Sequence, residues 1–190
     1  LAAQASTAAL TTLTWNPTDG GTFEQVIAKA TLDANGRNGL DPAFDKTRIA
    51  TYGYLPEWAD GSQGQNGWGN LAASTGFTYL DQNPWGTSYN YDDPRLAQTI
   101  DWFKSIIAKG YSPSFDKAST LSNDALLNAG KGAMTTAGSW MINSYLGESA
   151  KVTFAYAPLR PGRRAARPRS TACPTRSGRD RTQGRGLEMG

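Results

Sequence analysis

The 190-residue chain contains no histidine and a single cysteine, Cys173. The lack of histidine excludes Ser-His-Asp triads, histidine metal sites and histidine acid–base catalysis. One cysteine permits neither an internal disulfide nor a cysteine cluster around a metal. No stretch approaches the roughly 20 apolar residues of a membrane-spanning helix. We therefore expect no metal site built on histidine or cysteine and no membrane-spanning segment.

What the chain does contain is typical of a folded domain. Hydrophobic residues make up 38%, aromatic residues 11% and charged residues 18%. These fractions and the length predict one domain, or one large lobe, with a real core. A disulfide-free chain suits the cytosol but also many exported bacterial proteins, so composition leaves the compartment open.

Charge and aromatic content divide the chain near Leu159. Nine arginines against two acidic residues give residues 160–190 a charge of +7, which leaves −4 on residues 1–159. All six tryptophans precede residue 141, and the last 31 residues contain no aromatic residue. We predict a structured part over 1–159 and a disordered basic tail over 160–190. The alternatives are a tail that binds nucleic acid non-specifically, or a tail translated in the wrong reading frame from GC-rich DNA.

Helical and strand patterns alternate along residues 1–159. Apolar periodicity and turn residues predict helices over 22–32, 67–75, 93–109, 123–128 and 139–145, with Thr22, Asp93 and Ser139 as N-caps. Strands are predicted over 48–54, 133–137 and 152–156, with a small hairpin that pairs 77–80 and 87–91. This alternation predicts an α/β or α+β lobe.

Seven short motifs follow one another through residues 10–159. They are Thr14-Trp15, Thr51-Tyr-Gly-Tyr54, Tyr91-Asp-Asp-Pro94, Trp102-Phe103 with Lys109-Gly-Tyr-Ser-Pro113, Asn128-Ala-Gly-Lys-Gly-Ala-Met134, Ala137-Gly-Ser-Trp-Met141 and Phe154-Ala-Tyr-Ala-Pro-Leu159. In this order the chain resembles the extracellular solute-binding proteins of bacterial sugar ABC transporters, the maltose-binding-like group. The run from Gly130 to Met141, followed by Phe154 to Leu159, is the most specific part of the resemblance.

The resemblance implies a two-lobed, periplasmic-binding-protein-like receptor that closes by a hinge and passes a mono- or oligosaccharide to an ABC permease. Residues 1–159 would then be an incomplete C-terminal lobe, because the family's first lobe and its export signal are not in this chain. The intact protein would work outside the cytoplasm, in the periplasm or as a lipid-anchored protein at the cell surface. The resemblance further implies a binding protein and not an enzyme, with no catalytic residues, no metal site and no cofactor.

Four residues are candidates for the sugar site: Trp58, Trp68, Ser139 and Trp140. A sugar offers a flat C–H face to an aromatic ring and a rim of hydroxyls to polar side chains and backbone groups. The three tryptophans lie in glycine-rich or polar surroundings that suit cleft-lining loops, and in the resemblance Trp140 lies at a helix start that faces the ligand. The alternative for each tryptophan is ordinary packing.

Other aromatic and acidic residues have structural interpretations. We expect Trp15 to anchor the chain before the first helix, Trp102 to pack in a partly buried position on the long helix and Trp85 to cover the core from the surface. The Asp92-Asp93 pair suggests acid–base chemistry, but a helix N-cap explains it better.

Two further motifs superficially suggest ligand sites. The segment from Asp33 to Gly39 lacks the third acidic ligand and the closing glutamate of a calcium loop, so it predicts an Asx-rich turn. Gly130-Lys131-Gly132 lacks the glycine spacing of a phosphate loop and predicts a helix stop.

A carbohydrate-active enzyme is the rival function. Glycosidases need two carboxylates that face each other across the scissile bond. The candidates are Glu57, Asp60, Asp81 and Glu148, but nothing in the sequence fixes any two of them as a pair.

For the basic tail over residues 160–190, we expect no specific nucleic-acid partner.

Overall fold

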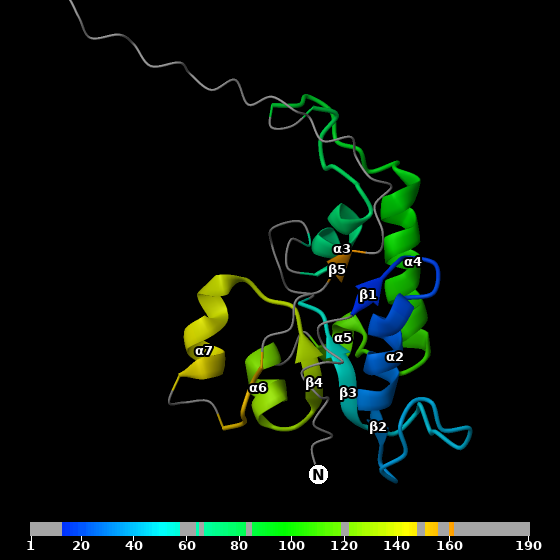
Figure 1. The fold of residues 1–190 in the computed structure, drawn as a ribbon. Coiled ribbons are helices and arrows are strands. Elements are labelled where there is room, and N and C mark those ends of the chain that lie inside the picture. Colours follow the sequence, from blue (N-terminus) through cyan, green and yellow to red (C-terminus); the bar gives the residue numbers. More distant parts are fainter. Residues whose placement is uncertain are drawn as a thin grey trace, which may run out of the picture.

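The structure is a computed structural model that describes residues 13–57, 64, 67–82, 85–118, 122–147, 151–155 and 160–161. The elements in chain order are β1 (Thr14–Trp15), α2 (Gly21–Ala30), β2 (Leu32–Asp33), β3 (Ile49–Leu55), α3 (Trp68–Ser74), α4 (Pro94–Ala108), α5 (Phe115–Ala118), α6 (Asn123–Asn128), β4 (Gly132–Thr135), the 3-10 turn η1 (Ser139–Met141), α7 (Ile142–Leu146) and β5 (Arg160–Pro161). Figure 1 shows their arrangement.

The main sheet has three strands in the order β2-β3-β4. β2 is antiparallel to β3, whereas β3 and β4 are parallel, with Tyr52 opposite Gly132 and Leu55 opposite Thr135. A separate pair joins β1 to β5 in parallel, so the first residues of the predicted tail take part in the fold. Parallel strands connected through helices confirm the α/β class.

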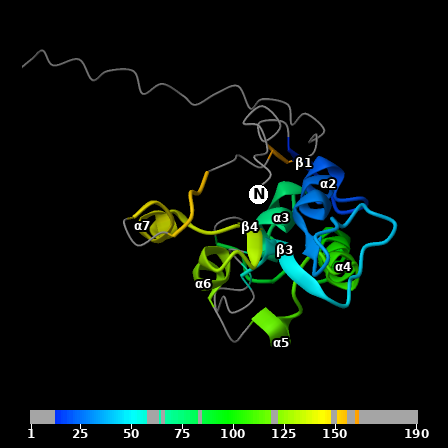
Figure 2. The same cartoon turned by 90° about the horizontal axis from the view of Figure 1, so that it is seen from below.

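Helices cover both faces of this sheet (Figure 2), with α2 and α4 on one side and α6 and α7 on the other. Adjacent residues of β3 point to opposite faces. Tyr54 belongs to the larger apolar cluster, which includes Phe23, Ile27 and Phe103, and its neighbour Leu55 belongs to the cluster that contains Leu127 and Tyr145. The result is a three-layer arrangement with a core on each face of the sheet.

The helix α2 confirms the predicted apolar stripe, but its N-cap is different. Gly20 occupies the cap position with φ 70°, and the Asp19 carboxylate accepts a hydrogen bond from the Gly21 N–H at 2.8 Å. The predicted cap, Thr22, is already inside the helix, where its hydroxyl accepts from the Thr14 N–H at 2.8 Å. Thr22 therefore ties β1 to α2 and does not cap the helix.

The long helix α4 begins and ends as predicted. Asp93 is the N-cap and accepts the Arg95 N–H at 2.8 Å, Pro94 is the first helical residue, and Gly110 follows the helix with φ 80°. The apolar periodicity of the sequence predicts a buried face of Leu96, Ile100, Phe103 and Ile107, which differs slightly from the observed one. The buried residues are Leu96, Thr99, Trp102, Phe103 and Ile106, whereas Ile107 is only half-buried.

The shorter predicted elements have mixed outcomes. Helices α3 and α6 and strands β3 and β4 lie within a few residues of their expected positions. The predicted hairpin is reduced to one antiparallel bridge, between Leu80 and Tyr89. The expected strand over 152–156 is wrong for residues 152–155, which lack strand pairing. Ser139 starts η1, but the cap position belongs to Gly138.

Three tryptophans outside the candidate site test the packing predictions. Trp15 is 1% exposed and Trp102 is 3% exposed, and their rings meet edge to face with centroids 5.4 Å apart, as expected of core residues. The indole N–H of Trp102 donates to the Glu24 carboxylate at 2.6 Å. The prediction for Trp85 is wrong, because this side chain is 87% exposed and does not cover the core.

The loop after β2 is an Asx turn, as predicted. Asp33 is buried, and its carboxylate accepts backbone N–H groups from Asn35, Arg37 and Asp45 at 2.8–3.0 Å. Burial alone would raise the pKa of Asp33, but the three N–H donors outweigh it and lower the pKa. The ionised carboxylate of Asp33 therefore holds both ends of the loop.

Candidate functional site

The carboxyl edge of the parallel pair β3–β4 is where the candidate residues originate. In open α/β sheets, ligands bind outside the carboxyl ends of the strands. Glu57 lies two residues after the end of β3, and the segment from Thr136 to Trp140 follows β4 directly. Gly67, just before α3, lies beside the Glu57 carbonyl oxygen, since a Cβ atom there would come within 3.2 Å of it. Trp68 and Ser139–Trp140 are thus on segments that adjoin one edge.

Hydrogen bonds fix the two strand ends to each other. The Thr135 hydroxyl donates to the Leu55 carbonyl at 2.7 Å, and the Asn123 side-chain amide donates to the same carbonyl at 3.1 Å. The neighbouring residues form a second link: the hydroxyls of Tyr54, one residue before Leu55, and of Thr136, one residue after Thr135, lie 2.8 Å apart. The base of the loop that carries Ser139 and Trp140 is therefore anchored to the sheet.

Tyr54 anchors this loop from inside the core. Its side chain is fully buried, and burial raises the pKa of its phenol to about 12, although the bond to Thr136 acts in the opposite direction. The phenol is neutral across the physiological pH range and serves as a fixed hydrogen-bonding group beneath the loop.

Trp140 is an exposed aromatic ring backed by a glycine. The side chain is 63% exposed. A Cβ atom at Gly138 would collide with three carbons of its six-membered ring, so this ring lies directly on the Gly138 backbone. One part of the indole surface is thereby packed, and most of the remainder faces solvent. Its neighbour Ser139 is also exposed.

The indole of Trp68 also packs against a glycine, Gly64, but it is less exposed than that of Trp140. A Cβ atom at Gly64 would collide with the five-membered ring of Trp68, and Gly64 has φ 74°, a backbone conformation that favours glycine. The indole is half-buried and packs against two apolar clusters, with the Tyr79 ring 6.1 Å away between centroids. Packing therefore occupies part of the Trp68 surface and leaves part of it accessible.

Comparisons with known proteins identify the group to which this arrangement belongs. Residues 5–183 match the family of bacterial extracellular solute-binding proteins, a wider span than the motifs between residues 10 and 159. The chain belongs to this family. Its known members are generally binding proteins and not enzymes.

One solved structure supports the fold assignment. The crystal structure of M. tuberculosis UspC, in its monoclinic form, is similar with a TM-score of 0.56 and 22% sequence identity. The similarity covers 72% of this chain and 33% of UspC, so the chain spans about a third of that protein. At this identity the similarity establishes the fold alone. A comparison with curated proteins gives no significant match.

Some of the candidate residues of this solute-binding family member lie outside the described part of the chain. Trp58, Asp60 and Glu148 are among them, as is the tail from residue 162 onward, including Cys173. Trp58 remains a candidate because it follows Glu57 at the carboxyl end of β3. The nucleic-acid and wrong-frame interpretations of the tail likewise remain sequence-based alternatives.

Two described carboxylates that were considered for acid–base chemistry, those of Asp81 and Asp93, have structural roles. Asp93 caps α4, and its hydrogen bond from the Arg95 side chain lowers the pKa of Asp93. Asp81 accepts three backbone N–H groups, from Gln82, Thr87 and Ser88. Among the described residues there is no group of three or more His, Cys, Asp or Glu side chains that could hold a metal ion.

A surface pocket of about 190 Å³ lies elsewhere, between α2 and the segments that carry Leu40 and Tyr111. Asp19 and Glu24 contribute its carboxylates. Glu24 is already bonded to Trp102 at 2.6 Å and to the Lys109 ammonium at 2.5 Å. The three candidate ligand residues that the structure describes, Trp68, Ser139 and Trp140, do not line this pocket. In the part of the chain that the structure describes, no helix is long and apolar enough to cross a membrane.

Proposed function

We propose that this chain forms part of the second lobe of a two-lobed receptor that captures a neutral mono- or oligosaccharide and delivers it to an ABC permease. The observation that carries the proposal is the pair of glycine-backed indoles, Trp68 and Trp140, on segments next to the carboxyl edge of β3–β4. A ring held against a backbone on one side offers its other side to the C–H face of a sugar.

The arginines of residues 1–159 support a neutral ligand. This part of the chain has three arginines, and each has a partner among the described residues. Arg37 donates to the Ala43 carbonyl at 2.9 Å, Arg48 pairs with Asp45, and Arg95 pairs with Asp93. Phosphate and carboxylate ligands are usually held by guanidinium groups, and none of these three is free to do so.

The proposal extends to how the receptor works. The second lobe supplies half of a cleft, and the first lobe would close over the sugar by a hinge. The intact receptor would act in the periplasm or at the cell surface, in agreement with the extracellular family. We expect this chain alone to bind a sugar weakly, because half of the contacts are missing.

A melting-temperature screen of the complete two-lobed receptor tests the proposal. Neutral mono- and oligosaccharides should raise its Tm, since a ligand that binds only the folded state stabilises it. The sugar should be recovered unchanged after long incubation. Release of shorter products would favour a carbohydrate-active enzyme. Stabilisation by phosphorylated or acidic sugars alone would contradict the neutral-ligand proposal.

A further inference from the structure

A second aromatic surface lies outside the candidate cleft, on the segment between α3 and α4. We name residues 77–92 the aromatic arm; the structure describes all of it except residues 83 and 84. Figure 1 shows the arm extending beyond α3, on the side away from β4, before it returns to the start of α4. Three large aromatic side chains on it are exposed: Trp85 at 87%, Tyr89 at 56% and Tyr91 at 50%.

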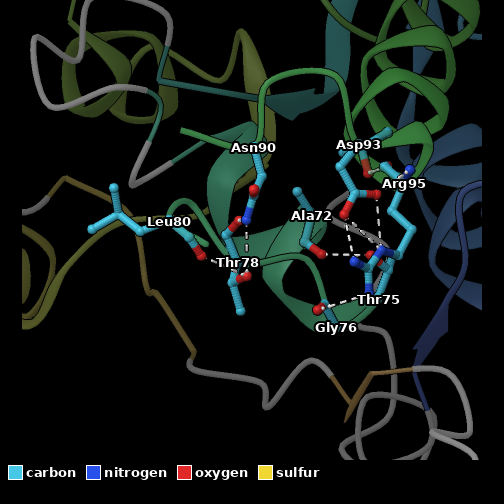
Figure 3. Close-up of polar contacts among 9 residues, drawn as sticks. Ala72, Thr75, Gly76, Thr78, Leu80, Asn90, Asp93 and Arg95 are labelled. Carbon is cyan, nitrogen blue, oxygen red and sulfur yellow. Dashed lines mark hydrogen bonds and ion pairs between the residues drawn. The ribbon is translucent and has the colours of Figure 1, made fainter. Parts of the chain in front are cut away.

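The arm is held in shape by polar contacts at its base, which Figure 3 shows. The Asn90 side-chain amide donates to the Thr78 carbonyl at 2.9 Å, and the Asn90 N–H donates to the Tyr79 carbonyl at 2.9 Å. The Arg95 guanidinium donates to the Gly76 carbonyl at 2.9 Å while it pairs with Asp93. The Asn90 bonds join the two sides of the arm to each other, and the Arg95 bond joins the start of α4 to the residue that precedes the arm.

Further contacts stabilise the rest of the arm. The Asp81 carboxylate accepts backbone N–H groups from the opposite side of the turn, at 3.0 Å from Thr87 and 3.3 Å from Ser88. Phe77 is 3% exposed and anchors the arm in the apolar cluster that contains Leu96. The arm therefore presents its aromatic rings from a supported backbone, which lowers the entropy cost of binding.

The tyrosines form an ordered surface. The Tyr89 and Tyr91 rings are nearly parallel, with 7° between their planes and 5.3 Å between their centroids. The two rings are stacked on each other, so each covers part of one face of the other. The stacked pair therefore offers a ligand the outer faces and the edges of its rings, and both side chains remain at least half exposed.

Composition and charge indicate what the arm binds. Residues 77–92 contain no lysine or arginine, and they carry two carboxylates beside Asp93, namely Asp81 and Asp92. Negative charge without a cation disfavours phosphates, nucleic acids and acidic glycans. The exposed apolar residues of the arm are all tyrosine or tryptophan, whereas Leu40, Ile142 and Leu146 supply exposed aliphatic surface elsewhere. Hydroxyls are provided by Thr87 and Ser88, which are exposed.

We propose that the aromatic arm is a surface site for a neutral polysaccharide, separate from the cleft. The C–H faces of sugar rings would stack on an outer face of the Tyr89–Tyr91 pair and on Trp85. Sugar hydroxyls would donate to Asp92, which has no ion-pair partner among the described residues, and would bond to the hydroxyls of Thr87 and Ser88. Such a site holds the receptor near a polymer from which its small ligand derives.

Affinity electrophoresis of the complete 190-residue chain tests this proposal. Native gels containing barley β-glucan, amylopectin or xyloglucan should retard the chain relative to a gel without polymer. Tyr89→Ala and Trp85→Ala should each weaken retardation roughly tenfold, as expected for the loss of one stacked ring. Tyr89→Phe should keep most of the binding, because it keeps the ring. Phe115→Ala removes an exposed aromatic ring outside the arm (55% exposed) and should bind as the wild type does.

Each other outcome overturns the proposal, provided that circular dichroism shows each variant to be folded. Absence of retardation by all three polymers excludes the site. Retardation that survives the combined Trp85→Ala, Tyr89→Ala and Tyr91→Ala replacement places the site elsewhere. If an oligoarginine peptide binds the arm and the polymers do not, the arm is an interface for a cationic protein segment. The cleft proposal is independent, because its ligand is a small sugar and its variants lie at Trp140 and Gly138.

Discussion

Trp140 shows how one small residue can prepare an aromatic ring for binding. The Gly138 backbone supports the six-membered ring, while 63% of the side chain remains exposed. A ring already held in place loses little conformational freedom when a ligand stacks on it. Any larger residue at position 138 would occupy the volume of the ring and push it away. The pair, and not the tryptophan alone, therefore defines this part of the candidate site.

In the complete receptor, we expect Trp140→Ala to weaken sugar binding by about 1–3 kcal/mol, through the loss of aromatic burial. Gly138→Ala should weaken binding in the same direction, because it displaces the ring without removing it. Titration calorimetry measures both, with Phe115→Ala as the control. Unchanged affinity in Trp140→Ala would remove this residue from the site.

Tyr54 connects the core to the same loop through its bond to Thr136. Tyr54→Phe removes the hydroxyl and should lower the free energy of unfolding by about 1 kcal/mol, the usual value of such a bond. Urea denaturation measures the change. Tyr52→Phe is the matched control, because Tyr52 is the other tyrosine of β3 and has no hydrogen bond through its hydroxyl among the described residues. Equal effects in both variants would show that the Tyr54–Thr136 bond contributes nothing specific.

Sequence reasoning at the residue scale succeeded where the local pattern decides burial. Packing was expected for Trp102 because it lies on a long amphipathic helix, and the structure buries it more completely than the partial burial predicted. Trp85 stands beside a proline in a turn, and a turn does not reveal whether its side chain folds back on the core or projects outward. The sequence does show a glycine two residues before Trp140. Because a glycine at this spacing also fits an ordinary turn, it could not reveal that Gly138 supports the ring.

At the scale of elements, α4 is specified most clearly by its own sequence. Asp93 accepts the Arg95 N–H, and its carboxylate lies at the positive end of the helix dipole. We expect Asp93→Ala to lower the free energy of unfolding by about 1 kcal/mol, the usual cost of a lost N-cap. Thermal or urea unfolding provides the measurement.

Asp92 is the matched control for this experiment. It is an exposed aspartate next to the cap and has no hydrogen bond to a described residue. Asp92→Ala should change the free energy of unfolding by no more than about 0.5 kcal/mol, as for most surface substitutions. If the two variants were equally destabilised, general charge near the helix and not the cap would be responsible.

Elements that depend on distant partners were predicted least well. The pairing of β1 with β5 joins residues about 146 positions apart, and each strand has two residues, so neither has a pattern of its own. The alternating sequence of residues 152–155 suggested a strand. In the structure, Phe154 packs against Tyr145 of α7 at 5.1 Å between centroids, and no strand pairs with this segment. Tertiary packing thus overrides a local preference for extended structure.

Across the whole molecule, the ionisable groups that support the fold have pKa values far from neutrality. Hydrogen bonds from Thr47 and Arg48 lower the pKa of Asp45, and the Arg95 side chain lowers that of Asp93. Burial raises the pKa of Tyr54 to about 12. Since the sequence has no histidine, no side chain has an ordinary pKa between about 5 and 8.

Stability should therefore form a plateau between about pH 5 and pH 8, where no side chain changes its proton occupancy on unfolding. As pH falls, the carboxylates of the unfolded chain take up protons at a higher pH than those of the folded chain, because folding lowers their pKa values. The stability that Asp33, Asp45 and Asp93 contribute is present above about pH 4 and is lost as pH falls through their folded-state pKa values.

At alkaline pH the dependence of stability on pH has the opposite sign: stability falls as pH rises, because the pKa of Tyr54 is raised in the folded state. The unfolded Tyr54 loses its proton near pH 10, whereas the folded one keeps it up to about pH 12, so stability falls by about 1.4 kcal/mol per pH unit in this window. Melting curves from about pH 3 to pH 11 measure the whole profile. In Tyr54→Phe the alkaline fall should be shallower, because the residue that must ionise is gone. A marked change of Tm between about pH 5 and pH 8 would contradict the plateau and would require a group whose pKa has moved into that range.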